Sequence, residues 1–245
     1  MTGPARRDVV LPELLLGLLL LTSMATGCRD RVVAAPPAAP PADPLPPAGA
    51  VSRVPAPAAP RVVFLGDSLA AGYGLAEDEA FPARVAKNLA ALGTPIHLVN
   101  AGVSGDTTAG GLSRLDWVLR QKPAILVVEL GANDGLRGQP LEGIEGNLRE
   151  IVRRGKAAGA KVLLVGMKMP PNYGREYTDG FAALYPKLAR EMDVALLPFL
   201  LEGVAAEPRL NQADGIHPTA EGAEIVARTV TPYLEKLLLS LKTAA

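Results

Sequence analysis

A serine and a distant Asp–His pair have the residue types and spacing that acyl transfer requires. Ser68 follows an apolar run that ends at Leu65, and Asp214 precedes His217 by three residues. A serine hydroxyl is a poor nucleophile at neutral pH and needs a base within hydrogen-bonding distance. One turn that carries both Asp214 and His217 lets the carboxylate accept from Nδ1–H while Nε2 faces the serine. The pattern therefore predicts Ser68, Asp214 and His217 as catalytic residues.

Each of these residues also has a plainer interpretation. Ser68 taken alone would be the N-cap of the following helix. His217, which a proline follows, would start a helix, with Asp214 as a turn residue. The other histidine of the chain, His97, lies between two aliphatic residues in a predicted strand, where we expect a structural role. This leaves His217 as the candidate base.

A tetrahedral intermediate also needs hydrogen-bond donors directed at its oxyanion. Gly105 has no side chain, so its backbone N–H can approach a substrate closely. The Asn133 side-chain amide and the Ser68 backbone N–H, at the start of the next helix, supply two more donors. As alternatives, Asn133 forms an Asx turn with Asp134, and Gly105 forms the turn into a helix. The prediction is an oxyanion hole made by Ser68, Gly105 and Asn133.

These residues can meet only if the fold brings distant loops to one edge of a sheet. Apolar, β-branched segments alternate with helical stretches, and the predicted strands are 61–66, 96–100, 124–130, 161–167 and 193–197. This alternation predicts a three-layer α/β/α sandwich with a five-stranded parallel, flavodoxin-like sheet and a switch point between the first and third strands. Apolar residues at helical spacing predict one helix that starts near Leu141 and ends at Gly159, and a final helix over 226–241.

Composition narrows the classes of function. The 245 residues carry no net formal charge and only 4% are aromatic, so neither a basic surface nor base-stacking platforms support nucleic-acid binding. One cysteine and two histidines exclude a disulfide framework and disfavour a metal site. We therefore expect no nucleic-acid partner and no bound metal ion.

Residues 1–28 are typical of a signal peptide. Two arginines precede an apolar run that is too short to span a bilayer, and small residues then lead to Cys28. The tetrapeptide 25–28 (ATGC) resembles a lipobox, which predicts cleavage before Cys28 and acylation of this residue. A plain secretory signal with an incidental cysteine is one alternative, and a twin-arginine signal at Arg6 and Arg7 is another. Either way, we expect an exported protein.

Residues 29–60 are predicted to be a linker. Ten of the 23 prolines fall between Pro36 and Pro60, mixed with alanine, a composition that favours extended polyproline II. At about 3.1 Å per residue such a segment spans on the order of 100 Å. We expect it to tether a domain over 61–245 to a membrane anchor.

Four short segments of the chain resemble the sequence blocks of the GDSL or SGNH hydrolase family. They occur in the order of the family's blocks, as GDSL (66–69), the Gly105 loop, GAND (131–134) and DGIHP (214–218). The S, G, N and H of the family name fall on Ser68, Gly105, Asn133 and His217. The resemblance extends over about 61–235 and is strongest to the bacterial arylesterase group, through LGANDGLRG (130–138), PNYG (171–174) and YPKL (185–188).

This resemblance implies the SGNH hydrolase fold, the Ser68–His217–Asp214 triad, the oxyanion hole described above and no cofactor. It also implies that the loop 135–140 moves on acyl binding and that Met169 and Pro170 contact the acyl chain. Methionine suits an adaptable apolar groove, with ordinary loop packing as the alternative. Glu129, a carboxylate that ends an apolar strand, receives no role beyond a hydrogen-bonded structural group.

The leading hypothesis is a serine esterase that hydrolyses lysophospholipids and other acyl esters, including thioesters, through an acyl-serine intermediate. Its partner is a small acyl ester, and we expect a monomer in the periplasm or cell envelope, anchored by lipid to a bacterial membrane. One alternative is a carbohydrate O-deacetylase of the same fold, which the scarcity of aromatic residues for sugar stacking disfavours. Another is a non-catalytic tethered binding module, which the complete set of site residues disfavours.

Overall fold

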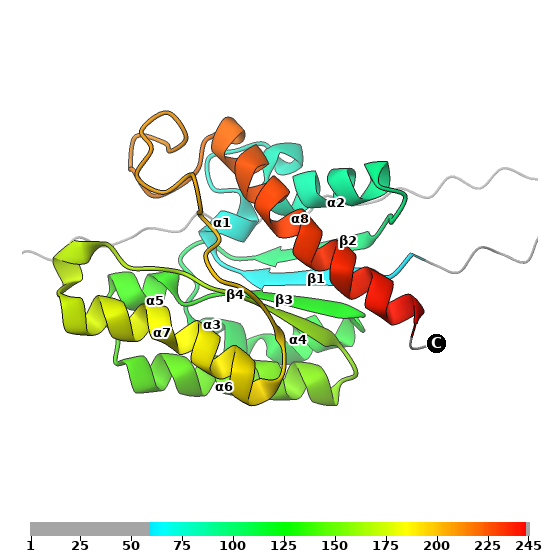
Figure 1. The fold of residues 1–245 in the computed structure, drawn as a ribbon, viewed down its shortest axis with the longest axis horizontal. Helices are drawn as coiled ribbons and strands as arrows, with labels where there is room; N and C mark the ends of the chain where they lie inside the picture. Colours follow the sequence, from blue (N-terminus) through cyan, green and yellow to red (C-terminus); the bar gives the residue numbers. More distant parts are fainter. Residues whose placement is uncertain (1–58, 244–245) are drawn as a thin grey trace, which may run out of the picture. The chain divides into compact units, whose positions relative to one another are not determined.

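The computed structural model describes residues 59–243, and the centre of this part is a five-stranded sheet (Figure 1). The strands are β1 (Arg61–Gly66), β2 (His97–Gly102), β3 (Ile125–Glu129), β4 (Lys161–Val165) and β5 (Ala195–Leu197). Their spatial order is β2-β1-β3-β4-β5, and every neighbouring pair is parallel. The predicted flavodoxin-like sheet is confirmed, with its switch point between β1 and β3.

The predicted signal peptide, Cys28 and all but the last two residues of the predicted linker lie outside the described residues. Within 59–243, no helix combines the length and the apolarity needed to cross a membrane. The same residues include no group of three His, Cys, Asp or Glu side chains placed to hold a metal ion.

Helices cover both faces of the sheet, which gives the predicted three-layer sandwich (Figure 1). On one face α2 (Phe81–Ala91) packs along α8 (Ala220–Lys242). The other face carries α3 (Thr108–Ser113), α4 (Leu115–Arg120), α6 (Leu141–Ala157) and α7 (Arg175–Met192). The shorter elements are α1 (Ser68–Ala71), α5 (Ala132–Leu136), and the 3-10 turns η1 (Glu77–Glu79) and η2 (Pro171–Tyr173).

Both helices predicted from apolar spacing are present. The repeated apolar side chains of α6 are buried, and Gly159 follows its last turn with φ +84°, the left-handed conformation that ends many helices. In α8, Val226, Val230 and Leu234 face the core. A helix with one such stripe is stabilised mainly by burying it, so α8 closes this side of the sheet.

The strand limits differ from the sequence prediction at several ends. β2 runs from His97 to Gly102 instead of 96–100, because it pairs with β1 along the whole length of β1. β5 begins only at Ala195, since Asp193 has φ +50° and caps α7 in the left-handed conformation. His97 is consequently exposed at the amino end of β2, away from the carboxyl edge where the site lies.

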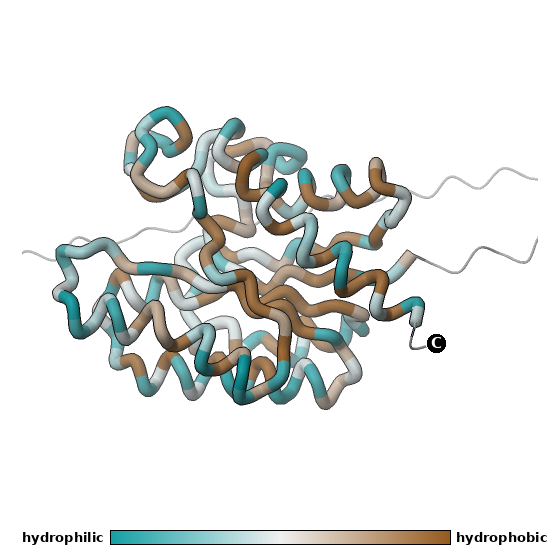
Figure 2. Tube along the Cα trace, viewed as in Figure 1, coloured by the Kyte–Doolittle hydropathy of each residue, from teal (hydrophilic) through white to brown (hydrophobic). Residues whose placement is uncertain are grey.

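The central strands are the most apolar part of the described chain (Figure 2). The side chains from Val62 to Leu65 in β1 and from Ile125 to Val128 in β3 are fully buried, as expected for a parallel sheet covered on both faces. Because β1 and β3 are parallel neighbours, the loops after them emerge side by side at the same edge. This places Ser68 near Asn133.

Candidate active site

Ser68 lies two residues after the end of β1, at the start of the short helix α1. Asp67 is the N-cap of that helix, since its Oδ1 accepts the Leu69 N–H at 3.0 Å. Ser68 is therefore the first residue of the helix, and the interpretation of Ser68 as an N-cap is wrong. Its hydroxyl is left free to interact across the edge of the sheet.

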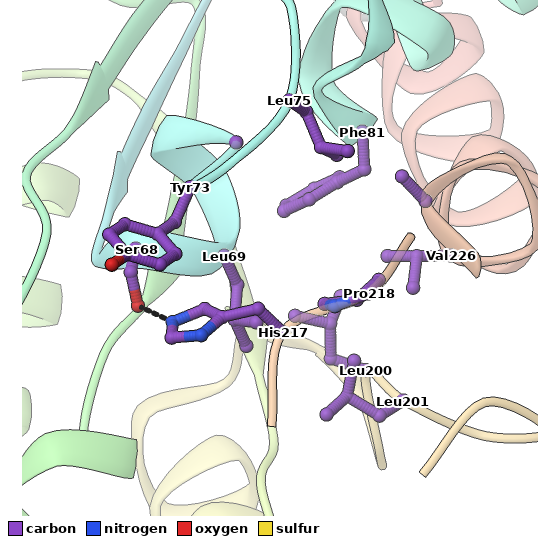
Figure 3. A pocket seen from close by; sticks show the side chains of 12 residues that line it. Ser68, Leu69, Tyr73, Leu75, Phe81, Leu200, Leu201, His217, Pro218 and Val226 are labelled. Carbon is purple, nitrogen blue, oxygen red and sulfur yellow. Dashed lines mark hydrogen bonds between the residues drawn. The ribbon is translucent and has the colours of Figure 1, made fainter. Parts of the chain in front are cut away.

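His217 joins Ser68 to Asp214 in one hydrogen-bonded array. The Nε2 atom of His217 lies 2.8 Å from Ser68 Oγ (Figure 3), and Nδ1 lies 2.7 Å from Asp214 Oδ2. The helix α8 begins only at Ala220, so His217 belongs to the preceding loop and does not start the helix. These distances are within the range needed for direct proton transfer between the serine and the imidazole.

The turn around Asp214 keeps its carboxylate ionised. Its Oδ1 accepts the backbone N–H groups of His217 and Ile216, at 3.0 and 2.9 Å. These bonds and the bond from the imidazole lower the pKa of Asp214 from 3.8 to about 2, the His217 N–H being the largest cause. An ionised acceptor holds the ring proton on Nδ1, which leaves Nε2 as the acceptor for the serine hydroxyl.

Tyr73 belongs to the site although the sequence interpretation missed it. Its ring centroid lies 4.5 Å from that of His217, with 37° between the two planes (Figure 3). The backbone N–H of Tyr73 donates to the Ser68 carbonyl at 3.0 Å, which fixes the turn that carries the ring. The only signal in the sequence was an aromatic residue between two glycines, Gly72 and Gly74. In the structure both glycines have positive φ.

Gly105 and Asn133, the two predicted oxyanion donors, reach the same edge of the sheet. Gly105 has φ +79°, in a turn that the Asp106 N–H closes by donating to Val103 O at 3.0 Å. Asn133 lies inside α5 and not in an Asx turn, and its Nδ2 donates to Asp67 Oδ2 at 3.1 Å. A primary amide has two N–H donors, so one remains for a ligand.

A cavity of about 490 Å³ brings these groups together. The residues predicted for catalysis, the oxyanion hole and acyl contact that line it are Ser68, Gly105, Asn133, Met169, Pro170 and His217. Much of the remaining wall is apolar, including Leu136, Met167 and Phe199. Met169 also packs tightly against α5, because a Cβ on Gly135 would lie 2.4 Å from its sulfur. The arrangement suits a substrate with one polar carbonyl and an apolar chain.

Ser68 and His217 also line a second cavity, of about 10 Å³ (Figure 3). Leu69, Phe81 and Val226 are among its lining residues. This volume is close to the roughly 10–15 Å³ that a single water requires. Of the two cavities that Ser68 and His217 line, the one of about 490 Å³ is therefore the candidate substrate site.

Arg114 fixes the loop that carries Gly105. Its Nε donates to Asp106 Oδ2 at 2.7 Å, and its Nη1 and Nη2 donate to the carbonyls of Ala101 and Gly66 at 2.6 and 3.0 Å. The guanidinium thus ties the ends of β1 and β2 to the residue after Gly105. Sequence reasoning missed this contact, because two of its acceptors are backbone carbonyls that carry no sequence signal.

Two buried carboxyl groups, those of Asp67 and Glu129, lie next to the turn that carries Ser68. Asp67 is 1% exposed and Glu129 is fully buried, and Glu129 Oε2 accepts the Asp67 N–H at 3.2 Å. Burial raises the pKa of Asp67 from 3.8 to about 6. Burial, together with the charge of Asp67, raises the pKa of Glu129 well above 4.5. Burial and the charge of Asp67 therefore favour the protonated form of Glu129.

A Ser–His–Asp array at the carboxyl edge of a doubly wound parallel sheet defines a serine hydrolase. The chain belongs to the GDSL-like lipase/acylhydrolase family, whose model matches residues 64–225. The family resemblance and the SGNH hydrolase fold predicted from the sequence are thereby confirmed.

Three known proteins illustrate the similarity. Over 182 residues the chain is 43% identical to Esterase TesA of Pseudomonas aeruginosa, covering 74% of this chain and 90% of that protein. It is 44% identical over 182 residues to Thioesterase 1/protease 1/lysophospholipase L1 of Escherichia coli K12, covering 74% and 86%. The crystal structure of the psychrotrophic esterase EstA from Pseudoalteromonas sp., inhibited by monoethylphosphonate, matches with a TM-score of 0.69 at 34% identity, covering 73% of this chain and 98% of that one.

Proposed function

We propose that this enzyme hydrolyses carboxylic esters of apolar acyl chains through a covalent acyl-Ser68 intermediate. The family is one of ester-hydrolysing enzymes. The observation that carries the proposal is the 2.8 Å contact between Ser68 Oγ and His217 Nε2, at the wall of a largely apolar cavity. A carboxylic ester fits this site, because Ser68 can attack its carbonyl carbon and the apolar cavity can hold its acyl chain.

In the first half of the reaction, Ser68 Oγ forms a bond to the carbonyl carbon while its proton passes to His217 Nε2. The carbonyl π electrons move to the oxygen, and this oxyanion accepts hydrogen bonds from the Ser68 N–H, the Gly105 N–H and the Asn133 amide. The ionised Asp214 stabilises the imidazolium. Collapse of the intermediate breaks the bond to the leaving alcohol or thiol, which takes the proton from Nε2.

In the second half, a water molecule attacks the acyl-Ser68 carbonyl. His217 Nε2 accepts the proton of that water, and the same donors hold the second oxyanion. Collapse returns the proton to Ser68 Oγ and releases a carboxylic acid. The chain's own residues thus supply the nucleophile, the base and the oxyanion donors.

The cavity supports acyl chains longer than acetyl as the substrate class. Leu136, Met167 and Phe199 provide apolar surface beyond the reacting atoms, and each methylene that such a wall buries stabilises the complex by about 0.8 kcal/mol. The Escherichia coli relative is named as a thioesterase and lysophospholipase, and we extend these two substrate classes to this enzyme. An acetyl-removing enzyme would leave most of this wall without contact.

The test compares p-nitrophenyl acetate with p-nitrophenyl octanoate, together with an octanoyl thioester and a lysophosphatidylcholine. Ser68→Ala should abolish turnover of every substrate while the circular dichroism spectrum stays unchanged, and Ser240→Ala on α8 is the matched control that keeps turnover. The wild-type kcat/KM should be higher for octanoate than for acetate. Undiminished turnover by Ser68→Ala contradicts the acyl-serine mechanism, and a preference for acetate favours the carbohydrate O-deacetylase.

The N-terminal sequence supports a location for this activity. We propose that the protein is exported to the periplasm or cell envelope as a monomer and is anchored to a bacterial membrane through acylated Cys28, with 29–60 as tether. Mass spectrometry of the protein from bacterial membranes should find a mature N-terminus at Cys28 that carries lipid, and Cys28→Ser should remove the lipid. An unmodified Cys28 contradicts the anchor, and a dimer mass in light scattering contradicts the monomer.

A further inference from the structure

Three successive backbone N–H groups surround the nucleophile, and they differ in what they bind. The Asp67 N–H donates to Glu129 Oε2 at 3.2 Å, and the Leu69 N–H donates to Asp67 Oδ1 at 3.0 Å. The Ser68 N–H between them donates to no acceptor among residues 59–243. The flanking N–H groups of Asp67 and Leu69 are therefore hydrogen-bonded to carboxyl groups, and the Ser68 N–H remains available to a substrate.

Glu129 reaches this turn through space that a glycine leaves. Gly66 and Glu129 are register partners in the β1–β3 pair. A Cβ on Gly66 would lie 2.5 Å from Glu129 Oε2 and 2.6 Å from the Cβ of Ala70. Any other residue at position 66 would displace the carboxyl group, so the glycine and the glutamate form one unit.

The burial of Glu129 is costly for the stability of the fold. Its side chain is fully buried, and its second oxygen, Oε1, has no hydrogen-bond partner in the described part of the chain. An unsatisfied buried polar atom destabilises the folded state by roughly 1–3 kcal/mol. An apolar residue of similar size would avoid this cost, so stability alone does not explain a glutamate here.

Asp67 links Glu129 to the third predicted oxyanion donor. While its backbone N–H is held by Glu129, its Oδ2 accepts the Asn133 side-chain amide at 3.1 Å. A shift of the Asp67 backbone would therefore move both the Ser68 N–H next to it in the chain and the Asn133 amide. These are two of the three donors in the proposed oxyanion hole.

We propose that Glu129 is a positioning residue for the oxyanion hole. Glu129 accepts the Asp67 N–H and thereby fixes the positions of the Ser68 N–H and the Asn133 amide. This role rests on the proposed acyl-Ser68 mechanism, because the donors matter only if an oxyanion forms. Glu129 does not touch the substrate itself.

The environment of Glu129 fits this role. Its burial and the nearby charge of Asp67 raise the pKa of Glu129, which favours a neutral group that accepts the amide hydrogen without adding a second negative charge near the developing oxyanion. Glutamine has the same shape and the same acceptor oxygen without a charge. Methionine has a similar size but no comparable acceptor.

The test measures kcat and KM for p-nitrophenyl octanoate in wild-type protein, Glu129→Gln and Glu129→Met, with thermal melts to show that each variant is folded. Glu129→Gln should keep the wild-type kcat. Glu129→Met should lower kcat by about 10- to 100-fold with little change in KM, because displaced oxyanion donors weaken transition-state binding. A folded Glu129→Met with the wild-type kcat, or a folded Glu129→Gln that loses kcat as Glu129→Met does, overturns the proposal.

Amide hydrogen exchange of the wild-type protein, followed by NMR, tests the same arrangement without any substitution and decides the question if Glu129→Met does not fold. The Ser68 amide should exchange faster than those of Asp67 and Leu69, and a phosphonate adduct should slow it. An Asp67 amide that exchanges as fast as that of Ser68 overturns the proposal. Wild-type protein without Ser68-dependent turnover would instead count against the proposed function.

Discussion

The Nε2 atom of His217 lies 2.8 Å from the Oγ atom of Ser68, although 149 positions separate the two residues in the chain. The parallel sheet explains this contact, because β1 ends two residues before Ser68 and the loop before α8 returns to the same edge. Asp214 lies in that same loop, where its Oδ2 accepts the imidazole Nδ1–H of His217 and its Oδ1 accepts the His217 backbone N–H. The predictions below test these relationships one at a time.

Replacing Asp214 by asparagine should lower kcat for p-nitrophenyl octanoate by about 10³- to 10⁴-fold, since an amide no longer fixes the imidazole tautomer or stabilises the imidazolium. KM should change little, because the substrate does not contact this carboxylate. Asp179→Asn, at an exposed position of α7, is the matched control. Wild-type kcat in folded Asp214→Asn would show that this carboxylate does not serve His217.

Asn133→Ala should lower kcat by about 10²- to 10³-fold, the usual effect of removing one oxyanion donor. Steady-state kinetics separate this from a loss of substrate affinity, which would raise KM and leave kcat unchanged. Asn88→Ala on α2 controls for the loss of an amide elsewhere in the chain. An increase in KM alone would assign Asn133 to ground-state binding.

Met169→Trp should shorten the range of acyl chains that the enzyme accepts, because a larger side chain fills part of the cavity. We expect kcat/KM for p-nitrophenyl octanoate to fall by about tenfold or more, in line with the effect of one or two methylene-sized contacts. Turnover of p-nitrophenyl acetate should persist. Met169→Leu, which nearly conserves volume, is the control. An equal loss for both esters would mean that Met169 packs the loop without contacting the acyl chain.

Asp67→Asn should change the pH dependence of stability. The pKa of Asp67 is raised from 3.8 to about 6 in the folded protein, mainly by burial. The folded state therefore binds this proton more tightly than the unfolded state. That stabilisation is complete below pH 4 and is lost as the pH rises through about 6. Asparagine carries no such proton at any pH.

Urea denaturation at pH 4 and at pH 7.5 measures this difference. The free energy of unfolding of Asp67→Asn, minus that of wild type, should increase by on the order of 2–3 kcal/mol from pH 4 to pH 7.5, as a shift of about two pKa units requires. The comparison cancels groups that titrate alike in both proteins. A difference that does not depend on pH would show that Asp67 titrates normally in the folded state.

The sequence predicted the sheet and the principal site because the informative residues are local. Ser68, Asn133 and Gly105 each lie in the loop or short helix that begins within a few residues of a strand's carboxyl end, so the strand pattern also located these segments. His217 was selected because the only other histidine, His97, lies in a strand. These inferences needed no knowledge of side-chain contacts.

The features that escaped prediction depend on contacts between segments that are distant in sequence. Arg114 binds carbonyls at the ends of two strands, and no pattern in the sequence marks a carbonyl as an acceptor. Tyr73 is recognisable as a site residue only from its ring contact with His217. Glu129 was noticed as an unusual strand residue, but its contact with the Asp67 N–H follows from the register of β1 and β3.

The most direct test of the account is covalent labelling with a fluorophosphonate, followed by peptide mass spectrometry. The reagent reacts with a serine only where a base activates it, so a single adduct should form on Ser68, and His217→Ala should abolish its formation in folded protein. An adduct on another residue, or equal labelling of Ser68 in His217→Ala, would contradict the account.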